Sequence, residues 1–452
     1  MNTFRRGMAL GETPQAVFDW HLRSASMERL IPPWASVQLL GSSGSLSEGG
    51  QVDLRVPWLL RGRKLTLRHT SQVLSGPVLR FRDVQDRGPF VHWVHTHRVR
   101  SAQTGALLED EVEWMLPGGG MGHMLGAGRV QRALERWFRH RYRRTAQDLA
   151  DHRAWSARPL RILVTGASGL IGRQLLSYLK AGGHQVIRGV RRPAGPGECQ
   201  WLPTLEPSSL TGVDGIVHLA GASIGRRWTA GVRNELRTSR VDTTALLARA
   251  IAACPEPRPV LVCASAIGAY GDRGDEVVDA RTASCDRGFL APLVTAWEAA
   301  AQPARDAGAR VVHLRLGLVL DPRGGALARM LPAFRWGLGG PLGQGDQWVS
   351  WVHVDDVLRA ALFALSAPLE GAVDVVSPRP VRARRFAAAL GRALGRPAVL
   401  PAPAPLLRAA FGDMAREALL ASTRVAPTLL QDAGFSLAHP RLDRALADLL
   451  GQ

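Results

Sequence analysis

The chain has 452 residues, 46% of them hydrophobic and 21% charged, which is typical of a globular protein of two or three domains and excludes a disordered chain. Its net charge of +19 is spread along the sequence, because residues 1–155 carry 22 basic and 14 acidic side chains and the remainder carries 35 and 24. Polyanion binding needs basic groups that neutralise neighbouring phosphates together, so this spread argues against a nucleic-acid partner.

The start of the chain and its cysteines bear on location. The first residues lack a continuous apolar segment after their charges, and no run of ~20 apolar residues follows anywhere. We therefore expect neither a secretory signal nor a stable membrane insertion. The four cysteines have no C-x-x-C spacing, which fits reduced thiols and predicts a cytoplasmic location.

Residues 1–150 predict a domain of mixed helix and strand. A strand at 4–10 precedes two short helices near 14–20 and 26–31, and a long helix around 124–150 closes the segment. Between them lie alternating, β-rich runs with turn residues at their ends, at 50–59, 64–74, 77–85, 89–100 and 106–116. In the long helix, Val130, Leu134, Trp137 and Phe138 share one face, so the arginines of 129–144 are expected on the solvated face.

This order of elements resembles the helix-grip fold of the START and polyketide-cyclase-like (SRPBCC) superfamily, together with the stretch "RGPFVHWVHTHRV…GALLEDEVEWMLP". The resemblance implies an α+β domain that encloses an apolar ligand. His92, His95 and His97 alternate along one strand, which puts His95 and His97 on the same face. No third ligand is identifiable nearby, so the interpretation is pocket lining, and no metal site is predicted.

A linker is predicted at 151–159, and from residue 160 to about 396 short apolar strands alternate with helical segments. Helices are expected at 173–183, near 229–253 and near 291–306. Such alternation is typical of an α/β Rossmann domain, a doubly wound parallel sheet with helices on both faces. A Pro/Ala-rich joint then leads into a small helical C-terminal domain at 397–452.

The stretch "LRILVTGASGLIGRQLLSYL" at 160–179 places glycines 166, 169 and 172 between an apolar strand and a helix. Glycine allows the tight turn, and it lets backbone amides approach a dinucleotide pyrophosphate at the positive helix N-terminus. The predicted contacts in this turn are Gly166, Ser168, Gly169, Leu170, Ile171 and Gly172.

The end of the second strand predicts which cofactor is bound. It reads "VIRGVRRPAG", with Arg191 and Arg192 close to its end and no carboxylate before Glu198. Guanidinium groups match phosphate geometry, whereas a carboxylate at this position would bind the ribose hydroxyl of NAD. We therefore expect NADP, with NAD still possible.

Several motifs in order, "TGASGLIG", "VDGIVHLAGASI", "SAIGAYGD", "LRLGLVLDPRGGAL" and "GLGGPLGQGDQWVSWVHVDDV", resemble the extended short-chain dehydrogenases/reductases. The similarity is closest to their epimerase-like branch, which ends in a small domain of unknown function resembling "LLASTRVAPTLLQDAGFSLAHPRLDRALADLL". The resemblance implies further cofactor contacts at Leu219, Ala220 and Gly221 and an active-site serine at Ser265. It also places Arg240 near the substrate cleft, although a surface helix arginine is an equal alternative.

The Tyr-x-x-x-Lys pair that such reductases use is missing. By the resemblance its positions fall on Leu290 and Val294, and no tyrosine of the chain has a lysine four residues later. Tyr270 is then the best candidate proton donor, with a packed tyrosine as the alternative. Without a lysine neighbour its pKa should stay near ~10, which is poor for general base catalysis.

Two further residues are predicted at the substrate side, Trp351 and His353 in "WVHVDDV", with core packing as the alternative for Trp351. The aspartates at 355 and 356 are expected to cap the next helix. The predicted function is an NADP(H)-binding epimerase- or oxidoreductase-like protein without the usual dyad, acting on a small, apolar organic substrate. The alternative is a non-catalytic sensor of NADP(H) and a lipid-like ligand.

Overall fold

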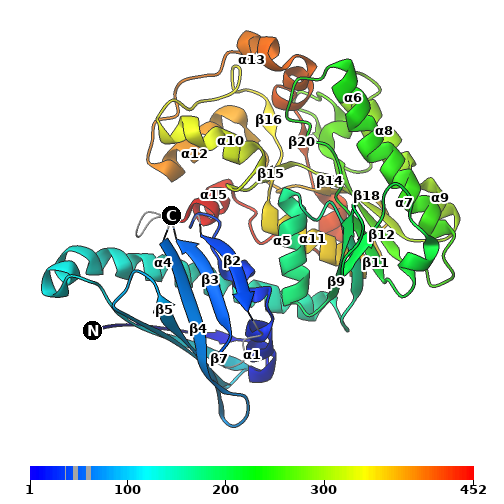
Figure 1. Ribbon diagram of the computed structural model, residues 1–452. Helices are drawn as coiled ribbons and strands as arrows, with labels where there is room; N and C mark the ends of the chain where they lie inside the picture. Colours follow the sequence, from blue (N-terminus) through cyan, green and yellow to red (C-terminus); the bar gives the residue numbers. More distant parts are fainter. Residues whose placement is uncertain (36, 44–48, 57–62) are drawn as a thin grey trace. The chain divides into compact units, whose positions relative to one another are not determined.

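The computed structural model describes residues 1–35, 37–43, 49–56 and 63–452 (Figure 1). The chain divides into two compact units, each with a hydrophobic core of its own. Unit 1 contains Met1–Ala157, Ser177–Gly183 and Gly451–Gln452, and unit 2 contains Arg158–Leu176 and His184–Leu450. Among the described residues, no helix combines the length and the apolar character needed to cross a bilayer.

Unit 1 is built on a seven-stranded antiparallel sheet with the order β1-β7-β6-β5-β4-β3-β2. Its strands are β1 (Asn2–Leu10), β2 (Gln38–Ser43), β3 (Gln51–Val56), β4 (Arg63–Val73), β5 (Val78–Arg87), β6 (His92–Ser101) and β7 (Ala106–Met115). The burial pattern of β7 alternates strictly along the strand, as expected for a sheet with one face against a core.

Among its described residues, unit 1 also contains the helices α1 (Pro14–Leu22), α2 (Ser26–Leu30) and α4 (Gly119–Trp155) and the end of α5 (Leu170–Ala181). The predicted order of one strand, two short helices, a run of strands and a long helix is confirmed, with β2 as an additional strand. The run predicted at 50–59 is a strand as far as Val56, and the rest of it lies outside the described residues. Helix α4 continues into the segment predicted as a linker, because Asp151 and His152 are helical and buried.

Helix α4 packs on the sheet through the predicted apolar face, since Val130, Leu134 and Phe138 join one core cluster with residues of β1, β6 and β7. The expectation that its arginines all face solvent is wrong, because Arg141 and Arg144 are buried. The reason is that the sheet surface under the helix is partly polar: Arg141 Nη2 lies 3.4 Å from Nδ1 of His97 on β6.

Unit 2 contains a seven-stranded sheet with the order β10-β9-β8-β11-β12-β14-β18, in which every neighbouring pair is parallel. The strands are β8 (Arg161–Thr165), β9 (Gln185–Val190), β10 (Glu198–Gln200), β11 (Gly215–His218), β12 (Val260–Ala266), β14 (Val311–Leu316) and β18 (Gly371–Val375). This is the strand order of a Rossmann sheet, in which the chain runs outward from β8 and then returns to its other side.

Helices cover both faces of this sheet, as predicted (Figure 1). On one side lie α5 (Leu170–Ala181) and α11 (Val354–Ser366), and on the other lie α7 (Thr243–Ala252), α8 (Leu290–Ala299) and α9 (Gln302–Asp306). The helix predicted near 229–253 is interrupted, because α6 (Ala230–Arg237) joins α7 through a π-helical turn. The helix predicted near 291–306 is likewise two helices, α8 and α9.

The C-terminal part of the chain belongs to unit 2. It contains α13 (Ala404–Phe411), α14 (Thr428–Asp432), α15 (Leu442–Leu450) and the short strand β20 (Arg424–Val425). Helix α15 shares one hydrophobic cluster with α10 (Gly325–Arg335), α12 (Ala383–Leu394) and β17 (Trp351–His353). The C-terminal segment therefore has no core separate from the rest of unit 2.

Candidate functional site

The turn after β8 is a glycine cradle. Gly166 has φ = +69°, and a Cβ placed on it would lie 2.5 Å from the carbonyl carbon of Leu219, which follows β11. A Cβ on Gly172 would lie 2.2 Å from the carbonyl oxygen of Gly166. Only glycine fits these two positions, so the backbones of three segments approach one another at the carboxyl ends of β8 and β11.

This point is the switch point of the sheet, since the chain leaves β8 toward β9 on one side and β11 lies on the other. Ligands of open α/β sheets bind in the crevice at such a point. Ser168 and Gly169 are exposed there, and Leu170 begins α5. The amides of the first helical turn have no intrahelical acceptor, so they present partial positive charge to an anion.

The two arginines after β9 differ in their surroundings. Arg192 makes a bidentate salt bridge with Glu198, with distances of 2.8 and 2.9 Å between guanidinium nitrogens and carboxylate oxygens. Arg192 holds the pKa of the Glu198 carboxyl below its usual range, with the backbone amide of Gly195 as a further donor. Arg191 is exposed and makes no ion pair with any residue that the structure describes. Arg191 thus differs from Arg192 in having an exposed guanidinium that no described carboxylate binds.

Arg240 lies beside the loop that follows β11. It donates a hydrogen bond to the carbonyl of Ala222 (2.9 Å), and its guanidinium lies 5.2 Å from the ring centroid of Trp297. Burial lowers the pKa of Arg240 to about 10. These contacts make Arg240 a residue that positions the Leu219–Ala222 loop, and no contact of it with a substrate follows from them.

Ser265, near the end of β12, is buried, and its hydroxyl donates to Oε1 of Glu298 on α8 at 2.6 Å. Glu298 also accepts two hydrogen bonds from Arg315 on β14, both at 2.8 Å. Burial acts to raise the pKa of Glu298, but the bonds and charge of Arg315 outweigh it and hold that pKa below its usual range. The serine hydroxyl is thus oriented by a carboxylate whose ionised form Arg315 stabilises.

Tyr270 is fully buried, and its hydroxyl donates to both oxygens of Asp374 at 2.8 and 2.9 Å. The same oxygen accepts a hydrogen bond from Arg315 at 3.0 Å. Burial and then the Asp374 charge raise the pKa of Tyr270, and burial raises the pKa of Asp374 to about 7. A tyrosine without exposed surface cannot reach a substrate in this conformation, so its contacts favour the alternative of a packed tyrosine.

The positions of the missing dyad are apolar and buried. Leu290 and Val294 lie on α8 in one cluster with Trp228 and Leu236. No described side chain near them replaces the lysine, because the chain has only Lys64 and Lys180. The site therefore contains the serine of the family pattern, but neither partner of the proton-relaying pair.

Trp351 and His353 do not lie on an open surface. Trp351 has no exposed area, and its indole N–H donates to the carbonyl of Arg379 at 3.2 Å. His353 is also fully buried, at the start of α11. Trp351 packs in one cluster with core residues of α12 and α15, and His353 lies against His439 and Asp448, so the predicted contacts with substrate do not fit this conformation.

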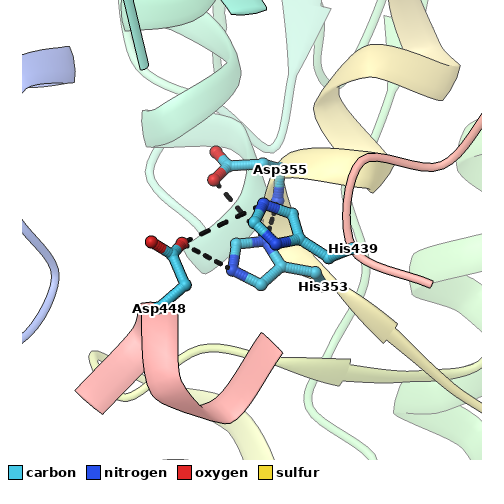
Figure 2. Close-up of side chains that lie close together, drawn as sticks. All are labelled: His353, Asp355, His439 and Asp448. Atoms are coloured by element: carbon cyan, nitrogen blue, oxygen red, sulfur yellow. Dashed lines mark hydrogen bonds and ion pairs between the residues drawn. The ribbon is translucent and has the colours of Figure 1, made fainter. Parts of the chain in front are cut away.

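Figure 2 shows His353 with its neighbours, its ring stacked on that of His439 at 3.8 Å. The backbone amide of Asp355 donates to Nδ1 of His353 at 3.1 Å, so the ring proton is on Nε2, which faces Asp448 Oδ2 at 3.2 Å. His353 is therefore the N-cap of α11, a role that we predicted for the aspartates at 355 and 356.

Asp356 has a different role, which the sequence did not indicate. Its carboxylate accepts hydrogen bonds from the backbone amides of Ala438 and His439, at 2.7 and 3.0 Å, and from Arg359 at 2.9 Å. Asp356 is fully buried, so these bonds are shielded from water. It attaches the segment before α15 to the N-terminus of α11.

Comparison with known proteins gives the family. The model of the "NAD dependent epimerase/dehydratase family" matches residues 162–376, and that of "Domain of unknown function (DUF1731)" matches residues 402–449. Epimerase family protein Mb2239 of Mycobacterium bovis is 44% identical over 291 residues, which are 63% of this chain and 96% of that protein. The chain belongs to the NAD dependent epimerase/dehydratase family.

Two solved structures extend the comparison. The nucleoside-diphosphate sugar epimerase from Corynebacterium glutamicum is 30% identical with a TM-score of 0.80, covering 100% of this chain and 90% of that chain. The human epimerase family protein SDR39U1, solved with NADPH, is 36% identical with a TM-score of 0.59, covering 64% of this chain and 99% of that chain. The predicted Rossmann-type epimerase domain and the C-terminal domain of unknown function are thereby confirmed.

Proposed function

We propose that unit 2 binds NADP(H) and acts as an epimerase- or oxidoreductase-like enzyme on a small organic molecule, without a Tyr-x-x-x-Lys dyad. The observation that carries this proposal is the glycine cradle at Gly166 and Gly172, where a Cβ would clash with backbone atoms. The human family member solved with NADPH supports the choice of cofactor. NAD remains the second possibility, since epimerases at lower similarity are solved with it.

The residues present fit the dinucleotide. Backbone amides at the start of α5 would bind the pyrophosphate, and Arg191 would bind the ribose phosphate that distinguishes NADP from NAD. Arg240 would hold the Leu219–Ala222 loop against the cofactor. When bound, the nicotinamide supplies or accepts a hydride.

The substrate side rests on Ser265. Its hydroxyl proton is held by Glu298, so its oxygen lone pairs are left to accept a hydrogen bond from a substrate hydroxyl. Tyr270 would hold Asp374 and Arg315 in place and would not donate the proton, because its hydroxyl is hydrogen-bonded to both of these residues. The proton for the substrate oxygen would then come from water or from the substrate itself.

The second candidate function is a non-catalytic sensor of NADP(H). Two observations favour it: the dyad positions Leu290 and Val294 are buried in an apolar cluster, and Tyr270 has no exposed surface. Under this proposal the cofactor would be bound without hydride transfer.

For unit 1 we propose a small-molecule-binding role, as the helix-grip resemblance implies. A cleft of about 540 Å³ lies between β1 and α4. Its lining includes Arg6, Arg139 and Arg143 beside Met8 and Tyr142. Three guanidinium groups beside apolar side chains suit an amphipathic, acidic ligand better than the wholly apolar one expected from the resemblance.

Titration with NADPH and NADH, followed by calorimetry and nicotinamide fluorescence, tests the cofactor proposal. Gly172→Ala should weaken NADPH binding at least about tenfold, because its methyl group meets the Gly166 carbonyl. Gly231→Ala is the matched control, since no atom lies within 4 Å of its Cβ. Absence of saturable NADPH binding by the unaltered chain would exclude both the enzyme and the sensor.

Enzyme and sensor are distinguished by isotope transfer. NADPH carrying deuterium at the nicotinamide C4 is incubated with panels of carbonyl compounds, enones and nucleoside-diphosphate sugars, and the products are analysed by mass spectrometry. Deuterium in a product supports the enzyme if the Ser265→Ala variant forms no such product. The variant must bind NADPH with unchanged affinity for this result to count. An epimerase returns the hydride that it takes from its own substrate, so the same compounds are also incubated with NADP⁺ and analysed for epimers. Cofactor binding with neither deuterium transfer nor epimer formation supports the sensor.

A further inference from the structure

Four adjacent strands of unit 1 bring five ionisable side chains to one face of the sheet. They are all at most 8% exposed: His69 on β4, Asp83 on β5, His95 and His97 on β6, and Asp110 on β7. The register explains the grouping, because Asp83 is paired with both His69 and His95, and His97 is paired with Asp110. Residues directly opposite one another on antiparallel strands have adjacent side chains.

The contacts within this group centre on the two carboxylates. His97 lies between them, with Nδ1 2.6 Å from Asp110 Oδ1 and Nε2 3.4 Å from Asp83 Oδ2. His95 Nε2 is hydrogen-bonded to the same Asp110 oxygen at 2.8 Å. His69 Nδ1 contacts the other oxygen of Asp83.

Two atoms of this group have no partner in the protein. Oδ2 of Asp110 and Nε2 of His69 are buried and have no hydrogen-bond partner among the described residues. Buried polar atoms of folded proteins almost always have a partner. The described side chains therefore do not satisfy this cluster completely, and a further group is expected in it.

The surroundings supply only part of the opposite charge. Arg141 of α4 is buried beside His97, with Nη2 3.4 Å from Nδ1, and its charge acts on Asp110. The remaining walls are aromatic: the ring of Phe81 stacks on His97 at 3.9 Å, and Phe138 meets His95 edge-on at 5.3 Å. His21 of α1 completes this side, 6.2 Å from the His97 ring. With neutral histidines, the two carboxylates and Arg141 sum to a charge of −1, so this shielded space favours a bound cation.

We propose that this cluster binds one divalent transition-metal ion through Asp83, His95 and His97. Each of these three residues offers one ligand atom, and the three atoms lie within 4.8 Å of one another. Asp110 supports the site, because it lies against Nδ1 of His97 and Nε2 of His95 and so leaves His97 Nε2 and His95 Nδ1 as the metal-binding nitrogens. Carboxylates that orient metal-bound histidines in this way are a regular feature of protein metal sites.

The donor set limits the choice of ion. Two imidazoles and a carboxylate suit Zn²⁺, Fe²⁺ or Co²⁺ better than Mg²⁺ or Ca²⁺, which prefer oxygen ligands throughout. Three protein ligands leave coordination positions for water or an anionic ligand. The His-x-His spacing does not indicate a third ligand, because Asp83 lies on the neighbouring strand.

The second His/Asp cluster, in unit 2 (Figure 2), lacks this geometry. Nδ1 of His353 is used by a backbone amide, and the rings of His353 and His439 are stacked at an angle of 19°. Nearly parallel rings direct their nitrogens along parallel lines, so these two do not converge on one ion.

The test uses the full-length chain, purified without a histidine tag, stripped with a chelator and reloaded separately with Zn²⁺, Co²⁺ or Fe²⁺. Metal content is measured after desalting, and Co²⁺ is also followed by its visible absorption, which reports the ligand geometry. We expect one ion per chain. Asp83→Asn and His97→Ala should each lower the affinity at least tenfold and alter the Co²⁺ spectrum.

His92→Ala is the matched control, because His92 is on the same strand and on the opposite face, near Glu113. It should bind one ion with the spectrum of the unaltered protein. Failure of the unaltered chain to retain any of the three ions overturns the proposal, and this result does not depend on how the variants fold. Equal retention by Asp83→Asn, His97→Ala and the unaltered chain overturns it as well, and the cluster is then a buried ion network only.

Discussion

Asp374→Asn should change the pH dependence of the stability of unit 2. Asp374 is 1% exposed at the centre of β18, directly opposite Arg315 on β14, and it accepts the hydroxyl of Tyr270. Burial raises its pKa from the ordinary value of 3.8 to about 7, although Tyr270 and Arg315 act in the opposite direction. An asparagine has nearly the same shape and cannot ionise.

The sign and the size of the effect of Asp374 on the free energy of unfolding follow from this pKa. Below pH 3.8 the carboxyl group is protonated in the folded and the unfolded chain, so it has no effect. Between 3.8 and about 7 only the unfolded chain ionises, so stability falls as the pH rises, and above about 7 the loss is complete. The difference of 7 − 3.8 = 3.2 pH units corresponds to at most about 4 kcal/mol at ~1.4 kcal/mol per unit.

The free energy of unfolding of Asp374→Asn minus that of the unaltered chain should therefore increase with pH and level off. Hydrogen exchange of peptides from β14 and β18 in increasing urea measures unit 2 separately from unit 1, and Asp286→Asn, at an exposed position, is the control. A difference that stays constant between about pH 5 and about pH 8 would show that burial does not perturb Asp374, and the reasoning would be refuted.

Three further predictions concern the cofactor site and the core of unit 2. Arg191→Ala should weaken NADPH binding by about 10- to 100-fold and leave NADH binding unchanged. Arg192→Ala should weaken NADPH binding less, because a carboxylate already binds its guanidinium. Equal NADPH affinities of the two variants in fluorescence titrations would contradict this. Tyr270→Phe should lower the thermal midpoint but retain any NADPH-dependent turnover, and loss of turnover at unchanged NADPH affinity would instead identify Tyr270 as the proton donor. Asp356→Ala should lower stability by about 3 kcal/mol and speed proteolysis of residues 438–450, and an unchanged cleavage rate would argue against its role as an attachment point.

The parts of the fold that local sequence determines were predictable. Alternating apolar residues identify most strands of unit 1, and the glycines at 166 and 172 identify the cradle because the steric requirement is met within a few residues. Strand β2 was missed, since "QLLGSS" ends in small polar residues and its pairing with β3 is irregular between Leu39 and Gly41.

The parts that depend on distant segments were not predictable in the same way. Trp351 and His353 lie on a short strand and are buried by residues that follow much later in the chain, such as Leu446 and Asp448 of α15. Their burial therefore cannot be predicted from the local sequence. The burial of Tyr270 likewise depends on Asp374, 104 residues later. For the histidine pair of β6, the signal that would have revealed Asp83 was the register of the β5–β6 hairpin.

The way α15 packs has a practical consequence for anyone who divides this protein into fragments. The first family match ends at residue 376 and the second begins at residue 402, so a truncation between them would be an obvious choice. A fragment ending there would lose helix α15, which packs against Leu327 and Leu331 of α10, together with the chain segment that Asp356 anchors. The epimerase part and the domain of unknown function should therefore be expressed together. We expect them to unfold cooperatively, because helix α15 of the second covers apolar core residues of the first.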